Sequence, residues 1–185
     1  MLLTELLAKH PEAVSGIARQ TPVWVWGLLA GLTALGLSAT RDRSLHIGRI
    51  VLMPLIMGAL ALWGVQSAFG ASGRLAELLA LWGACYATLL IVGTRMAPPA
   101  GARYDAATHS FALPGSWVPL VLILSVFLMK YGIGVQLAMA PELPRDAGFA
   151  FTVTALYGLL SGLFAARTLR VLRLAYPTRA PLAAA

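Results

Sequence analysis

Charged side chains are scarce in this sequence: Asp, Glu, Lys and Arg make up only 11% of its 185 residues. A water-soluble globular domain carries about 25% of these residues. Hydrophobic residues make up 59% of the chain, and they are concentrated in long runs. So little charge excludes a surface covered by water, and long apolar runs are typical of membrane spans. We expect a polytopic membrane protein that forms one domain.

Cysteine pairs and catalytic patterns are also missing. Cys85 is the single cysteine, which excludes an internal disulfide and a CxxC redox or metal pair. His10, His46 and His109 lie in different segments without the spacing of metal ligands. The sequence has no Ser/His/Asp arrangement, no phosphate-binding glycine loop and no paired carboxylates within an apolar run. We therefore expect no metal site, no cofactor and no enzyme activity.

The N-terminal segment lacks the basic region that opens a signal peptide. Glu5 stands where that region would be, so we expect the mature protein to begin at or near Met1. Apolar residues recur at helical spacing over residues 1–20, but polar residues and Pro11 interrupt them. This pattern predicts an amphipathic helix that lies in the membrane interface.

Five apolar runs follow, and they predict an all-α fold, a membrane bundle of five transmembrane helices within residues 21–176. The expected spans are about 22–39, 47–69, 75–93, 115–138 and 149–166. The last span continues into a basic helical extension, and residues 177–185 are expected to form a disordered tail. In the longest polar stretch, residues 102–105 and 109–112 can pair as a short β-hairpin.

The distribution of Lys and Arg predicts the orientation. One side of the five-span arrangement carries most of them: Arg41, Arg43, Arg49, Arg95, Arg103, Arg167, Arg170, Arg173 and Arg179. The richer side should be cytoplasmic, which places the N-terminus outside and the C-terminus inside a bacterial inner membrane. The net charge of +7 then reflects topology and anionic lipids rather than a nucleic-acid partner.

Small residues mark two helix faces where backbones can approach closely. Gly27 and Gly31 form a GxxxG pattern in the first span. The fifth span has a small residue at every fourth position: Thr154, Gly158, Gly162 and Ala166. Packing within the chain is favoured for both faces, with a dimer interface as the alternative.

Lys130 is the most informative residue because it lies well inside the fourth apolar run. A Lys at the centre of a span costs about 2.5–3.5 kcal/mol on translocon scales. Glu77, near the outer end of the third span, is the expected partner, in an ion pair or a shared water network. The charge then serves either as a binding site for a substrate, an ion or a lipid headgroup, or as a polar staple between helices.

Other polar and aromatic residues are also candidates for binding or anchoring roles. Tyr131, Tyr157, Gln66 and Gln136 could line the same outer cavity as Lys130, but hydrogen bonding between helices is favoured. Trp24, Trp26 and Trp117 stand where aromatic side chains anchor a protein at the membrane interface. Arg167, Arg170 and Arg173 are expected to bind anionic lipid, with a partner-docking helix as the alternative.

Two segments carry a resemblance to known families. They are Thr21 to Trp26, and Arg103 to Trp117 followed by Lys130 and Tyr131. They resemble an uncharacterised family of bacterial inner-membrane proteins with a domain-of-unknown-function label. The Phe-x-x-Pro-Gly-Ser-Trp pattern over residues 111–117 is also similar to that of CcdC-like membrane proteins, linked by name to cytochrome c biogenesis. The single cysteine argues against a thiol relay.

These features leave two hypotheses for function. In the first, the protein binds or transports a small or lipid-like solute in an outer-half cavity around Lys130. Five helices are few for a transporter, so transport would require a homo-oligomer. In the alternative, the protein is a non-catalytic accessory or scaffold subunit that packs with other membrane proteins.

Overall fold

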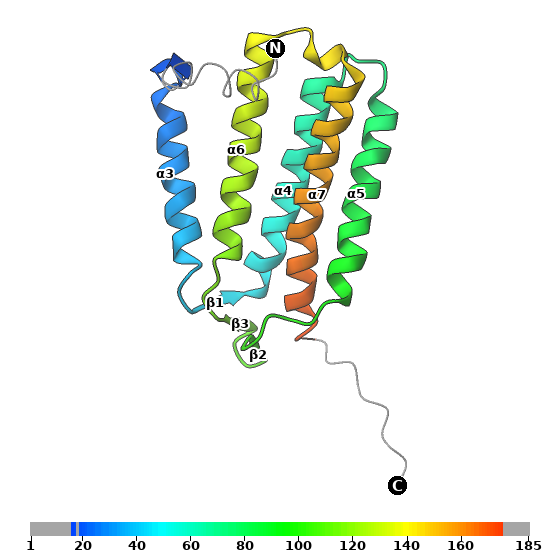
Figure 1. Cartoon of the computed structure of the whole chain (residues 1–185). Helices are drawn as coiled ribbons and strands as arrows, with labels where there is room; N and C mark the ends of the chain where they lie inside the picture. Colours follow the sequence, from blue (N-terminus) through cyan, green and yellow to red (C-terminus); the bar gives the residue numbers. More distant parts are fainter. Residues whose placement is uncertain (1–15, 18, 176–185) are drawn as a thin grey trace.

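The computed structural model describes residues 16, 17 and 19–175, and it contains the five helices expected from the sequence (Figure 1). They run side by side, and a short 3-10 helix, η1 (Leu143–Arg145), precedes the last one. The five are α3 (Val23–Ser38), α4 (Ile47–Phe69), α5 (Leu75–Arg95), α6 (Val118–Met139) and α7 (Ala147–Leu172). The expected interfacial helix, except for residues 16, 17, 19 and 20, and the expected tail lie outside the described residues.

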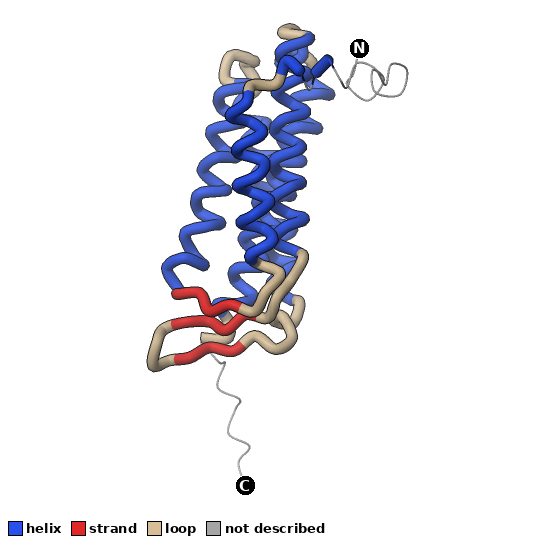
Figure 2. The backbone as a smooth tube through the Cα atoms, turned by 90° about the vertical axis from the view of Figure 1, so that its left-hand side faces the viewer, coloured by secondary structure: helices blue, strands red, loops and turns tan. Residues whose placement is uncertain are grey.

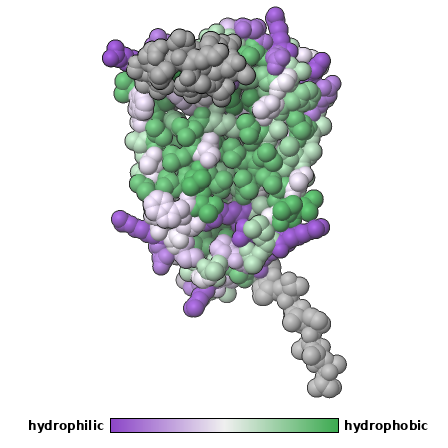
Figure 3. Space-filling model, viewed as in Figure 1, coloured by the Kyte–Doolittle hydropathy of each residue, from purple (hydrophilic) through white to green (hydrophobic). Residues whose placement is uncertain are grey.

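Four of these helices, α4 to α7, are long and apolar enough to cross a membrane. α3 has 16 residues, which reach about 24 Å at a rise of about 1.5 Å per residue. A span needs about 20 residues for a hydrocarbon core of about 30 Å. The membrane assignment is therefore supported by four helices, and a fifth span at α3 stays a prediction. Figure 3 shows the apolar middle of the molecule, with hydrophilic residues gathered at both ends.

The fold is mainly helical, as expected, and three short strands form a small antiparallel sheet at one end of the bundle (Figure 2). The expected hairpin is confirmed as β2 (Arg103–Asp105) and β3 (Ser110–Leu113). The third strand, β1 (Arg43–His46), pairs with the other edge of β3. It lies between the first two expected spans, where the sequence predicts no strand, since four residues acquire strand structure only through a partner distant in sequence.

The segment before α6 ties α6 to α3 at this sheet end. The Gly115 amide donates a hydrogen bond of 2.8 Å to the Asp42 carboxylate, and the Ser116 amide donates one of 2.9 Å to the Ala39 carbonyl. A Cβ at Gly115 would overlap the Thr40 carbonyl, so only glycine fits there. The loop therefore holds the start of α6 against the end of α3.

The small-residue face of α7 packs directly on α5, as the favoured interpretation predicted. A Cβ added at Gly158 would lie 2.6 Å from the Trp82 carbonyl oxygen and 2.8 Å from the Cys85 Cβ. One added at Gly162 would lie 2.9 Å from the Tyr86 carbonyl oxygen. Glycine is therefore what allows the two backbones to approach so closely. By contrast, in the part of the chain that the structure describes, no atom beyond the backbone of α3 lies within 4 Å of the Cβ position of Gly27 or Gly31.

The helices divide into two groups. α7 lies between α4 and α5 and packs extensively against both, while α3 packs against α6. Contact between α6 and α7 is sparse, and in Figure 1 the α3 and α6 pair stands to one side of the other three helices.

Buried clusters close the bundle at both ends. Phe69, Val65 and Leu78 pack at the end opposite the sheet, and Phe111, Ile50 and Val171 pack beneath the sheet.

We predict that Gly158→Ala destabilises the protein by about 1–3 kcal/mol, the usual range for overpacking a tight contact. The added methyl group must push α7 away from the Trp82 carbonyl. Thermal unfolding in detergent, followed by circular dichroism, measures the loss. Gly83→Ala is the matched control on α5, where no atom lies within 4 Å of the new Cβ. An equal loss in both variants would contradict the role assigned to this contact.

Candidate functional site

Lys130 lies where three helices meet. Its side chain is half-buried on α6, and its Nζ lies 5.1 Å from the centroid of the Tyr157 ring on α7. Gly64 on α4 completes the contact, since a Cβ there would lie 3.3 Å from both the Lys130 Nζ and the Tyr157 hydroxyl. A cation over an aromatic face is worth about 2 kcal/mol or more when desolvated. The aromatic ring therefore offsets part of the cost of the charge.

Glu77 does not reach this position. It is exposed in the first turn of α5, and α5 packs against α7 and α4 rather than against α6. No ion pair joins Lys130 to Glu77 in the described part of the chain. Both residues do lie toward the end opposite the sheet, but the order of the helices separates them. The pair was expected because the two residues have opposite charges and similar depths in the membrane. Whether they meet depends instead on which helices are neighbours.

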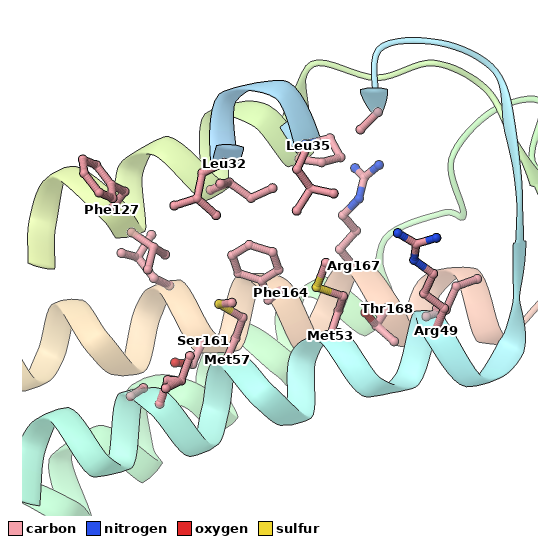
Figure 4. A pocket seen from close by; sticks show the side chains of 18 of the residues that line it. Leu32, Leu35, Arg49, Met53, Met57, Phe127, Ser161, Phe164, Arg167 and Thr168 are labelled. Carbon is pink, nitrogen blue, oxygen red and sulfur yellow. The ribbon is translucent and has the colours of Figure 1, made fainter. Parts of the chain in front are cut away.

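An apolar cavity of about 360 Å³ extends from Lys130 toward the sheet, between the two helix groups (Figure 4). This is within the range of sites that hold small molecules, about 300–1,000 Å³. Leu32 and Leu35 line it from α3, Met53 and Met57 from α4, and Phe164 from α7. Lys130 and Tyr157 belong to its lining, and three arginines complete it: Arg43, Arg49 and Arg167. The interior is thus mainly apolar, and its charged groups are all basic.

A second cavity of about 790 Å³ lies between α3 and α6 toward the opposite end, and it shares Leu28, Phe127 and Lys130 with the first. Tyr131 lines it, and the Tyr131 hydroxyl shares a hydrogen bond with the Thr21 hydroxyl. Lys130 therefore lines both hollows and is the one cationic side chain that these two described cavities share.

The remaining expected site residues are placed differently. Glu77, Gln66 and Gln136 line neither of the two cavities. Arg43 and Arg49 are site residues that the sequence does not indicate, since there they stand out only as positive charges on one side of the spans. Nothing in their spacing could have shown that β1 and α4 bring them to the same cavity. Tyr157, weighed mainly as a hydrogen-bonding group, instead presents its ring face to Lys130.

The residues expected to anchor the protein in lipid show a mixed picture. Trp24, Trp26 and Trp117 are exposed, as an anchoring role requires, and that role stays a prediction. Of the basic extension, the Arg170 guanidinium donates a hydrogen bond of 3.0 Å to the Ala97 carbonyl. Arg173 likewise donates to the Thr94 carbonyl at the end of α5. These two guanidinium groups satisfy backbone carbonyls there, whereas Arg167 lines the cavity.

We predict that Lys130→Met leaves the fold intact and raises its stability by about 1 kcal/mol. The substitution removes a cost of about 2.5–3.5 kcal/mol and gives up a cation–aromatic contact of about 2 kcal/mol. Unfolding in mixed detergent micelles, followed by tryptophan fluorescence, gives the difference, and Lys130→Arg serves as the charge-retaining control. A clear loss of stability in Lys130→Met alone would mean that the charge is a structural staple.

Comparison with known proteins gives a family but no activity. No curated protein and no solved structure matches the chain, and the similarity to CcdC-like membrane proteins finds no support. The expected resemblance to a family of unknown function is confirmed, because a family described as "Family of unknown function (DUF6622)" matches residues 1–183. The match covers both helix groups, the sheet and every residue that lines the two cavities. The chain therefore belongs to the DUF6622 family.

Proposed function

We propose that this protein binds a lipid-like solute in the apolar cavity between its two helix groups. The observation that carries the proposal is the lining itself: hydrophobic side chains from four helices, with basic groups as its charged members. Apolar walls favour hydrocarbon and disfavour a bare ion, which would lose its hydration without gaining ligands. An amphiphile suits such a cavity because its hydrocarbon part can contact the apolar walls while its polar part contacts the basic groups.

Lys130 supplies a polar contact for the solute at the depth of the membrane's hydrocarbon core. No carboxylate neutralises it in the described residues, and the Tyr157 ring lies on one side of its ammonium group. Unpaired ionisable groups within spans commonly mark a solute pathway. Lys130 also lines both cavities, so a solute that moved between them would pass it. Transport is a further step of this proposal, and with few helices it would require an oligomer.

We predict that Met57→Trp lowers the retention of lipid by the purified protein. The larger side chain would fill the cavity from α4, while Leu55→Trp on the same helix, 63% exposed and outside the lining, is the matched control. Native mass spectrometry in a neutral detergent counts the lipid molecules that remain bound. We expect the wild type and Leu55→Trp to retain lipid and Met57→Trp to lose most of it.

The alternative function, an accessory or scaffold subunit, is favoured by one observation. Among the described residues, no atom beyond the backbone of α3 itself lies within 4 Å of the Cβ positions of Gly27 and Gly31, so no described segment covers this GxxxG face. Such faces accept a neighbouring helix in a membrane. If no variant of the cavity changed lipid retention, and Gly27→Leu abolished an oligomer seen by cross-linking in membranes, the scaffold function would replace the binding function.

We also propose that the sheet end faces the cytoplasm of a bacterial inner membrane. Described arginines at this end include Arg41, Arg43, Arg95 and Arg103, and they outnumber those near the α4–α5 turn and η1, Arg74 and Arg145. Short loops rich in Lys and Arg stay on the cytoplasmic side.

Cysteine labelling tests this orientation. In a Cys85→Ala background, Ala71→Cys places a thiol in the turn after α4, and Ala106→Cys places one in the turn between β2 and β3; both alanines are exposed. We expect a membrane-impermeant maleimide to label Ala71→Cys on intact cells, and Ala106→Cys only after permeabilisation. The reverse pattern would invert the topology.

A further inference from the structure

Three arginines from separate elements converge at the sheet end of the first cavity. Arg43 comes from β1, Arg49 from the start of α4 and Arg167 from the end of α7, and all three line the cavity. Figure 4 shows the guanidinium groups of Arg49 and Arg167 directed into the space between the helix groups. Arg43 and Arg167 are half-buried, so these two charges are not simply part of a solvated surface, whereas Arg49 is exposed at the mouth of the cavity.

Within the described residues, none of these three guanidinium groups forms an ion pair or donates a hydrogen bond. The two acidic residues of the sheet end are occupied elsewhere. Asp42 accepts the amide of Gly115 at 2.8 Å. Asp105 accepts the Ala107 amide at 2.9 Å and the Thr108 hydroxyl at 2.7 Å within the β2–β3 turn. Arg170 and Arg173, by contrast, donate to backbone carbonyls. The three cavity arginines lack such an acceptor among the described residues.

This grouping of like charges is unfavourable without an anion. Burial, together with the positive charge of Arg49, lowers the pKa of the Arg43 guanidinium. The positive charges persist, because an arginine guanidinium is not deprotonated in proteins. A phosphate group would offset the repulsion, since the planar guanidinium matches two phosphate oxygens at once.

The rest of the cavity determines what the anion is attached to. From Arg167 toward Lys130, the lining is formed by side chains such as Phe164, Met53 and Met57. A soluble anion would leave these apolar walls uncovered, whereas an acyl chain would cover them at a gain of about 25 cal/mol per Å² of buried apolar surface. Charge at one end and hydrocarbon beyond it are the two parts of a phospholipid.

We propose that Arg43, Arg49 and Arg167 bind the phosphate of an anionic phospholipid whose acyl chain occupies the cavity toward Lys130. This inference rests on the proposed function and specifies its ligand class and headgroup site. It also gives the ligand a direction, with the headgroup at the sheet end. The site differs from general attraction of lipid to a basic surface because it uses three particular arginines that line one cavity.

Lipid binding by the full-length protein in a neutral detergent tests the inference. Phosphatidylglycerol and phosphatidylcholine with identical acyl chains are titrated, and binding is followed by native mass spectrometry and by the rise in melting temperature, which reports ligand bound to the folded state. We expect the wild type to prefer phosphatidylglycerol. Each of Arg43→Gln and Arg167→Gln should weaken its binding about tenfold, as expected for the loss of a charge-assisted hydrogen bond.

Arg41→Gln and Arg103→Gln are the matched controls, because both arginines are exposed at the same end and neither lines the cavity. Arg167→Lys keeps the charge and should retain part of the preference. Melting in detergent without added lipid checks folding. We expect Arg43→Gln to melt no lower than the wild type there, since it relieves repulsion by Arg49.

Three results would overturn the inference. They are an equal loss of preference in the control variants, a preference that persists when all three cavity arginines are replaced by Gln, and equal stabilisation by inorganic phosphate alone. Binding of phosphatidylcholine distinguishes failure of this inference from failure of the proposed function. Met57→Trp should lose both lipids, whereas the arginine variants should lose only the preference for phosphatidylglycerol. If Met57→Trp retained both lipids, the cavity itself would not be the binding site.

Discussion

Helices in a bilayer gain little by hiding apolar side chains from one another, because lipid tails are equally apolar. The association of α7 with α5 therefore depends on close backbone contact, which Gly158 and Gly162 permit against the carbonyls of Trp82 and Tyr86. The small residues of α7 face α5, so its larger residues lie on its other faces. Among these, Phe164 lines the cavity. The tight contact on one face thus determines which side chains remain for the other.

The small sheet has a structural role larger than its size suggests. β1 connects α3 to α4, and β3 leads into α6, so pairing of β1 with β3 joins the two helix groups at one end. Phe111 on β3 is fully buried against the ends of α4 and α7. At the other end a second cluster around Phe69 closes the bundle. Between these closed ends, sparse contact between α6 and α7 leaves room for the cavity.

The distribution of charge around this space makes the proposed ligand physically reasonable. Lys130 faces an aromatic ring rather than a carboxylate, and at the sheet end Arg43, Arg49 and Arg167 lack acceptors among the described residues. Basic groups in an otherwise apolar space are costly, and an anionic amphiphile would offset both costs at once. The proposed function and the headgroup site thus follow from the same imbalance, although each can fail separately.

Apolar runs and turn residues by themselves determined the membrane class, the five helices and the β2–β3 hairpin, because these depend on neighbours in sequence. Small residues on α7 also indicated a close helix contact within the chain. Only the tertiary structure decided that β1 is a strand, that Lys130 meets Tyr157 instead of Glu77, and that Arg43 and Arg167 share a cavity. The reason is physical: periodicity shows which face of a helix is apolar, whereas the neighbour of that face depends on how all the helices pack together.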